Sequence, residues 1–187
     1  MPEAGRHAPI LIATSWQALG RAINEGPDAL ICNCTVVVLF AGFFVEANLN
    51  HIIQRLGKGS SLAAFTGGKT YPGLQDKLAW FYNEFVARAR RPDVRTAYRY
   101  GIGKTVRRRF PGFAGLSRFR NDISHGVINE TGRSLVKAQR LRQQATEMVA
   151  ELFAILERRG HRIPRTTTYW QAIKSGLFFL RRSPLGA

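Results

Sequence analysis

Apolar residues recur three and four positions apart along most of the chain, which is the spacing of one face of a helix. The first such stretch follows Thr14 and has its apolar positions at Trp16, Leu19, Ala22 and Ile23. After a break in which Asp28 is the expected N-cap, residues 29–56 form one long apolar pattern. Its first half is apolar nearly all round, and a helix of that kind is normally buried. We therefore expect residues 29–56 to be the central helix of the fold.

Residues 57–73 are rich in Gly, Ser and Lys, and they predict a loop. A second helix is expected over residues 74–89, and Pro92 ends it. Its buried face is expected at Leu74, Leu78, Phe81 and Phe85. Residues 92–111 predict a basic, glycine-containing connection with room for a short helix.

The rest of the chain predicts helices over residues 115–125, 134–158 and 169–180. The middle one has the clearest pattern, with apolar positions at Leu135, Leu141, Ala145, Val149, Leu152 and Leu156. The sequence offers no convincing strand pair and no internal repeat. These patterns predict an all-α protein, an up-and-down bundle of four to five main helices. Residues 1–160 would form the bundle, and residues 161–187 would form a basic C-terminal extension.

Charge adds a functional expectation, because the chain carries 28 Lys and Arg against 12 Asp and Glu, a net charge of +16. Residues 1–100 hold 11 of these cations and 7 of the anions, a net charge of +4. The residues after Tyr100 hold the other 17 cations and 5 anions, a net charge of +12. A basic excess confined to one half is typical of contact with a polyanion. Nucleic acid is the first partner that it suggests and an anionic membrane surface the second. A simple preference for Arg in the coding sequence is the ordinary alternative.

The apolar run at residues 29–45 falls at the lower edge of the length that spans a membrane. Polar residues follow it at once, so a buried bundle helix explains it better, and we expect no membrane span. The apolar run near Ile10 is too short for a secretory signal. Cys32 and Cys34 fit a reducing, cytoplasmic location, and we expect both to be small buried hydrophobic residues.

The segment from Arg118 to Gly126 combines the residue types needed to cleave RNA. On a helix Asn121 and His125 lie one turn apart, and Arg120 is offset from His125 by about 140°. His exchanges protons near neutral pH, and Arg presents a fork of donors to phosphate oxygens. A base to take the 2′-OH proton, an acid for the leaving 5′-oxygen and a cation for the developing charge would therefore be present.

Arg120-Asn121-Asp122-Ile123-Ser124-His125 resembles the R-x4-H motif of HEPN-domain ribonucleases, in which a polar residue commonly follows the Arg. The apolar helix that runs into residues 44–50 resembles the earlier core helix of that family. The resemblance covers roughly residues 28–158, although only the six-residue motif is specific. It implies metal-independent RNA cleavage that leaves a 2′,3′-cyclic phosphate, with no cofactor. Arg120, Asn121 and His125 would be the catalytic residues.

The resemblance also implies a homodimer whose two motifs face each other across a cleft. Because one chain offers a single well-placed His, pairing two copies of His125 would supply both proton-transfer groups. Many members of the family act as toxins with an antitoxin partner or in phage defence. One subfamily is silenced by AMP transfer to a Tyr two places after the His. Val127 stands there in this chain, so that regulation is not expected.

Ordinary structural roles compete with each of these assignments. In the alternative interpretation Asn121 caps the helix, Arg120 pairs with an acid, and His125 closes the helix. Glu46 is expected to be a buried acid that pairs with an Arg of a neighbouring helix and helps to orient the motif. A non-catalytic HEPN-like module that binds nucleic acid or a nucleotide is the alternative function.

Cations that would contact the RNA backbone gather in the predicted connection and beside the motif, where they neutralise phosphates without reading sequence. They are Lys104, Arg107, Arg108, Arg109 and Arg118. Three aromatic residues flank them and could stack exposed bases: Tyr98, Tyr100 and Phe110. A solvated basic loop is the ordinary alternative for this stretch.

Residues 63–70 fit a relaxed phosphate-loop pattern, but the sequence predicts no buried strand before them, so nucleotide hydrolysis is not expected. The four histidines are scattered without metal-ligand spacing, and we expect no metal site.

Overall fold

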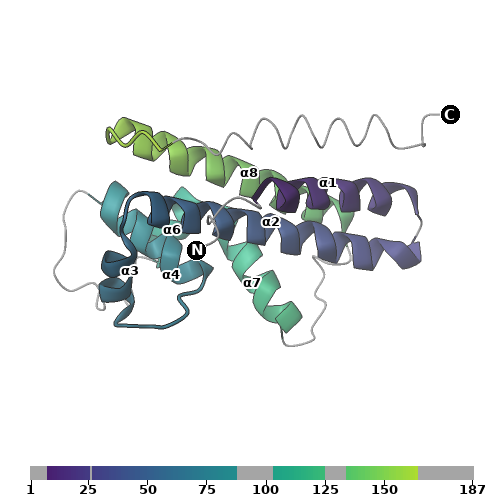
Figure 1. Cartoon of the computed structure of the whole chain (residues 1–187). Coiled ribbons are helices and arrows are strands. Elements are labelled where there is room, and N and C mark those ends of the chain that lie inside the picture. Colours follow the sequence, from purple (N-terminus) through teal and green to yellow (C-terminus); the bar gives the residue numbers. More distant parts are fainter. Residues whose placement is uncertain (1–7, 26, 88–102, 125–133, 164–187) are drawn as a thin grey trace.

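A computed structural model of the chain describes residues 8–25, 27–87, 103–124 and 134–163. Three long helices run side by side in it: α1 (Ala8–Asn24), α2 (Pro27–Arg55) and α8 (Leu135–Arg158), as Figure 1 shows. The described residues contain α-helices and one π-helical turn and no strand, which confirms the predicted all-α class.

The shorter helices form two groups, which contact each other through α4 and α6. One group consists of α3 (Gly59–Thr66), α4 (Leu74–Phe81) and the π-turn η1 (Tyr82–Val86). The other consists of α6 (Gly103–Arg109) and α7 (Phe113–Ser124). Toward its C-terminal end α7 runs away from α3 and α4 (Figure 1).

The central position predicted for residues 29–56 is confirmed, because α2 contacts α1, α7 and α8 as well as α3 and α4. The helix starts at Pro27, a residue that suits the first helical position because its missing N–H has no partner there anyway. Asp28 therefore lies inside the helix and is not its N-cap, contrary to the prediction.

The face that α1 buries differs from the predicted one. It is spaced by four and three residues and includes Ile12, Ser15, Leu19 and Ala22. Trp16 and Ile23 lie off this face and are 36% and 60% exposed. Ser15 Oγ donates to the carbonyl of Val37 on α2 at 2.8 Å, so a polar group is satisfied within this contact. The indole of Trp16 is instead covered by the guanidinium of Arg142 from α8, whose Cζ lies 3.5 Å from the ring centroid.

Helix α3 lies in a stretch that was predicted to be a loop, and that prediction was wrong. Glycine and serine lower intrinsic helix propensity, but tertiary contacts outweigh it here. Leu62 is buried, and Ser61 Oγ accepts a hydrogen bond from Trp80 Nε1 at 3.2 Å. Gly67, at φ +69°, then ends the helix in a left-handed cap.

The predicted face of the next helix is confirmed, because all four of its expected apolar positions are buried: Leu74, Leu78, Phe81 and Phe85. Regular helix ends at Phe81, and the single π-turn that follows carries Phe85 to the core. Pro92, the predicted end, lies outside the described residues.

Helix α8 begins at its N-cap Ser134, whose hydroxyl accepts from the amide of Lys137 at 3.3 Å. Four of its six predicted apolar positions are buried, and Leu135 and Leu141 are partly buried. After Gly160, the ring of His161 packs edge-on against Phe85. The predicted helix at 169–180 lies outside the described residues, as does most of the predicted basic extension.

Candidate functional site

The C-terminal part of α7 contains Arg120 and Asn121, the first two residues of the predicted motif. Their side chains lie outside the described part of the chain, as does His125, whose position comes directly after Ser124. On either side of them Arg118 is exposed and Asp122 partly exposed. Arg118 Nε and Asp122 Oδ2 lie 3.8 Å apart, one turn along the helix.

Helix α7 is held by its apolar face, which buries Phe113, Leu116 and Phe119 against the core. Its first turn comes very close to α8. A Cβ atom at Gly112 would lie 2.5 Å from Cβ of Gln144, and one at Gly115 would lie 2.5 Å from Cδ2 of Leu141. The motif therefore stands at the end of a helix whose other end is fixed against α8.

Glu46 lies on α2 and forms an ion pair with Lys77 of α4, with 2.7 Å between Oε1 and Nζ. Both side chains are largely buried, so water screens the pair weakly. The prediction for Glu46 was a buried pair with an Arg, and the pair that the structure describes is with a lysine.

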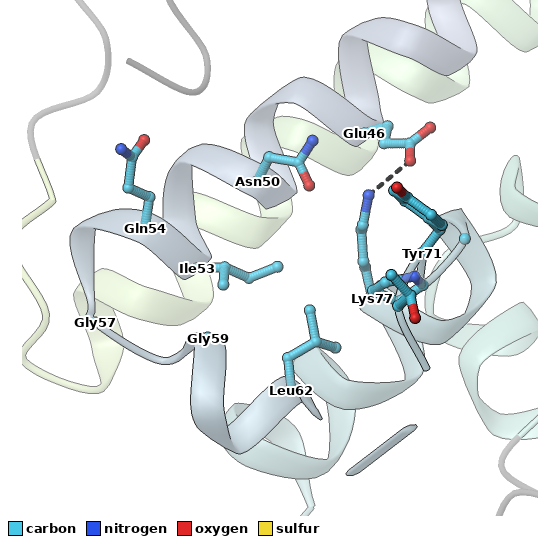
Figure 2. A pocket seen from close by; sticks show the side chains of 12 residues that line it. Glu46, Asn50, Ile53, Gln54, Gly57, Gly59, Leu62, Tyr71 and Lys77 are labelled. Carbon is cyan, nitrogen blue, oxygen red and sulfur yellow. Dashed lines mark hydrogen bonds and ion pairs between the residues drawn. The ribbon is translucent and has the colours of Figure 1, made fainter. Parts of the chain in front are cut away.

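A pocket of about 710 Å³ lies at this ion pair, between the C-terminal half of α2, α3 and the loop that leads into α4. Figure 2 shows the carboxylate of Glu46 and the amine of Lys77 in its wall, with Tyr71 beside them. Prediction from the sequence missed this pocket. A usable signal existed, since Glu46, Asn50 and Gln54 follow one another at four-residue intervals on one face of α2.

The predicted backbone-binding cations do gather on one short helix, because Arg107, Arg108 and Arg109 form the exposed last turn of α6. The side chain of Lys104 lies outside the described part. Glu151 of α8 pairs with Arg109 and, at 2.9 Å, with Arg158, so cations distant in sequence meet at this surface.

Phe110 is buried, so its predicted role as a stacking platform for bases was wrong. It directly follows α6 and packs into the core, where its ring is out of reach of any RNA base. Tyr98 and Tyr100, the other two predicted stacking residues, lie outside the described residues.

The relaxed phosphate-loop pattern has a different geometry here. Its residues form the end of α3 and the cap after it, with Gly67 and Gly68 at positive φ. Lys69 points to Asp76, with Nζ 2.7 Å from Oδ2. A helix precedes this loop, where the phosphate-binding mechanism needs a buried strand. These residues therefore lack the strand, loop and helix order of a phosphate loop.

Among the residues that the structure describes, no group of three His, Cys, Asp or Glu side chains is placed to hold a metal ion. The two cysteines differ, since Cys34 is buried in the core and Cys32 is exposed. The expectation that both would be buried was therefore wrong for Cys32.

One helix in the described part is long and apolar enough to cross a membrane, by length and composition, and it covers Leu30–Arg55 of α2. Its outward face in the first half is apolar. That stripe consists of the exposed Cys32 and Phe43, the latter 38% exposed, and of Val36, Leu39 and Phe40, which are partly buried. Polar pocket residues continue the same face from Glu46 onward.

Comparisons of the chain with protein-family models, with curated proteins and with solved structures give no match.

Proposed function

We propose that this protein is a metal-independent endoribonuclease of HEPN type, which cleaves RNA through attack of the 2′-OH and leaves a 2′,3′-cyclic phosphate. The observation that carries the proposal is the placement of Arg120 and Asn121 near the C-terminal end of α7, in a protein whose described residues form helices and no strand. His125 follows Ser124, the last residue of that helix, in the sequence. The exposed arginines of α6 support it, because they offer the RNA backbone a cationic surface near the start of the same helix.

In this proposal His125 takes the proton of the 2′-OH as that oxygen attacks the phosphorus. The bond from phosphorus to the 5′-oxygen breaks, and the leaving oxygen takes a proton from His125 of a second copy of the chain. Arg120 stabilises the charge that develops on the phosphoryl oxygens. Asn121 positions either Arg120 or His125.

A homodimer belongs to the proposal, because acid and base catalysis require two proton-transfer groups and the motif supplies one per chain. We propose that the second copy packs on the apolar stripe of α2, Cys32 to Phe43. Exposed apolar side chains in contact with one another on one helix are typical of interaction surfaces, and Phe40 and Phe43 contact edge to face with centroids 6.0 Å apart. A cytoplasmic toxin or phage-defence role, with an acidic antitoxin or regulatory partner, completes the proposal.

The test compares wild type with His125→Ala in an RNA cleavage assay that contains EDTA. We expect wild type to cut and to leave cyclic-phosphate ends, and the variant to lose the activity. His161→Ala is the matched control, because it removes a histidine that packs on Phe85 away from the motif. Equal cleavage by wild type and His125→Ala would contradict the assignment, as would pure wild-type protein that binds a broad panel of RNAs and leaves all of them intact.

A non-catalytic nucleic-acid-binding module is the second candidate, and the same α6 surface favours it, because binding by exposed cations needs no proton transfer. In that case Arg120→Ala would weaken RNA binding, and no cleavage would exist to be lost.

A further inference from the structure

The pocket at the Glu46–Lys77 pair has the size of a small-molecule site. Its volume of about 710 Å³ falls inside the range of about 300–1,000 Å³ that is usual for ligand pockets. It opens to solvent, since Gln54, Gly59, Thr70 and Tyr71 on its lining are exposed. Its lining comes from α2, α3 and α4 and from the loop that leads into α4 (Figure 2).

The lining has three chemically distinct parts. Ile53 and Leu62 supply buried apolar surface. Glu46 and Lys77 place an acceptor and a donor side by side, with 2.7 Å between Oε1 and Nζ. Tyr71 supplies an aromatic ring that is 87% exposed, although a ring of that size is normally covered. Apolar surface, a paired donor and acceptor, and an uncovered ring together suit a flat heterocycle with polar edges.

We propose that this pocket binds a guanine base. One edge of guanine carries the O6 acceptor next to two N–H donors, on N1 and N2. A lysine amine has three donors, so Lys77 can keep its bond to Glu46 and also donate to O6. A carboxylate has about four acceptor positions, so Glu46 can accept both guanine N–H groups while it retains its other partners.

Other bases fit this pair less completely. The polar edges of adenine and cytosine each carry a single amino donor group beside a ring acceptor, and uracil offers a single N–H between two carbonyls. Adenine, cytosine and uracil would each offer Glu46 a single donor group. Guanine offers two adjacent donor groups, which match the two carboxylate oxygens. Tyr71 would stack on the ring of the bound base, and stacking of this kind tolerates any base. The pair therefore sets the preference, and the ring adds affinity.

The ligand has two possible sources, a free guanine nucleotide or an unpaired guanine in RNA. The site lies at α3 and α4, from which the motif end of α7 points away, and base binding needs no cleavage (Figure 1). The inference therefore does not rest on the proposed ribonuclease activity, and each can fail without the other.

Isothermal titration of the full chain at physiological salt tests the site, with GMP, AMP and inorganic phosphate as ligands. We expect GMP to bind about tenfold or more tightly than AMP, since a good bidentate contact discriminates between bases by that amount. Phosphate alone should bind far more weakly. An unstructured oligouridylate with one central guanine, compared with one that carries a central adenine, identifies the source. Tighter binding of the guanine oligonucleotide than of the adenine one indicates an RNA base. Equal binding of the two oligonucleotides beside a preference for GMP over AMP indicates a nucleotide.

Two variants locate the binding. Tyr71→Ala changes an exposed residue, so folding should be kept, and GMP affinity should fall about tenfold. Glu46→Gln should remove the preference for GMP over AMP, and its folding is checked by thermal unfolding. Glu147→Gln, an exposed acid on α8, and Gln75→Ala, an exposed residue of α4, are the controls and should bind as wild type does. Equal affinity for GMP and AMP, unchanged GMP binding by Tyr71→Ala, or no binding of GMP and of the guanine oligonucleotide would overturn the proposal.

Discussion

Gly112 and Gln144 approach so closely that a Cβ atom on the glycine would lie 2.5 Å from Cβ of the glutamine. This contact joins the turn before α7 to the middle of α8. It leaves no room for a side chain, because the atom that would be met lies next to the backbone of α8 and cannot rotate away. The direction of α7, and with it the position of the motif at its end, depends on this glycine.

Gly112→Ala should destabilise the protein by about 1–3 kcal/mol, since an added methyl group must push two packed helices apart. Chemical denaturation followed by circular dichroism measures the change in the free energy of unfolding. Gly42→Ala is the matched control in the middle of α2, where an added Cβ meets nothing within 4 Å. It should stabilise the protein by about 0.5–1 kcal/mol, because alanine favours helix over glycine. Equal effects of the two substitutions would contradict the close contact.

The two cysteines should react very differently with a thiol reagent. Burial raises the pKa of the Cys34 thiol, and the side chain is enclosed in the core. Cys32, two residues earlier on the same helix, is exposed. The thiolate is the reactive form, and Cys32 lies on the stripe that the second copy would cover. Protein kept monomeric by Phe43→Lys should therefore show one fast-reacting thiol at mildly alkaline pH, and denatured protein should show two. Cys32→Ser should abolish the fast reaction. Two fast thiols in native protein would show that α2 does not bury Cys34.

Removal of Arg107 and Arg108 together should weaken RNA binding and lower its salt dependence. Each phosphate contact that is lost should reduce the slope of log affinity against log salt by about 0.7 for single-stranded RNA. Fluorescence anisotropy with a labelled RNA at several salt concentrations measures both quantities. Arg21→Ala and Arg55→Ala combined form the control, because they remove the same charge from exposed positions of α1 and α2. If both double variants lose affinity equally, net charge governs binding and α6 has no special part.

Phe43→Lys should convert the proposed dimer to a monomer, because a charge on the apolar stripe of α2 would have to be buried unpaired in the interface. Light scattering after size exclusion gives the mass. The fold should be kept, since Phe43 is partly exposed. Ile23→Lys, an equally apolar and more exposed change on α1, is the control and should leave the mass unchanged. A monomeric wild type, or a wild type that fractionates with membranes, would contradict the homodimer on this stripe.

Several predictions about single helices were confirmed because one periodic pattern in the sequence determined each of them. The stripe from Leu74 to Phe85 was found by spacing alone, and all of it is buried. The limits of α8 were also near to prediction, because Ser134 is a good N-cap and Gly160 a good terminator. The buried face of α1 was harder to predict. Trp16 fits a helical pattern as well as Leu19 does, but Arg142, distant in sequence, covers its ring at the surface.

Other features needed contacts that no local pattern contains. The helix at Gly59–Thr66 forms in a Gly- and Ser-rich stretch because Leu62 and Ser61 find partners on other elements. Phe110 looked like an aromatic residue in an exposed basic segment, and only packing shows that it belongs to the core. The pairing of Glu46 with Lys77, 31 residues apart, creates the proposed guanine site.

The sequence by itself determined the helical class, the central place of α2 and the basic character of the second half. These follow from local periodicity and from a sum of charges, which need no knowledge of contacts. Tertiary structure decided which face of α1 is buried, where α7 points, and which polar residues meet in a pocket. The physical reason is that such contacts join residues far apart in the chain, and their energies are fixed only when the helices pack.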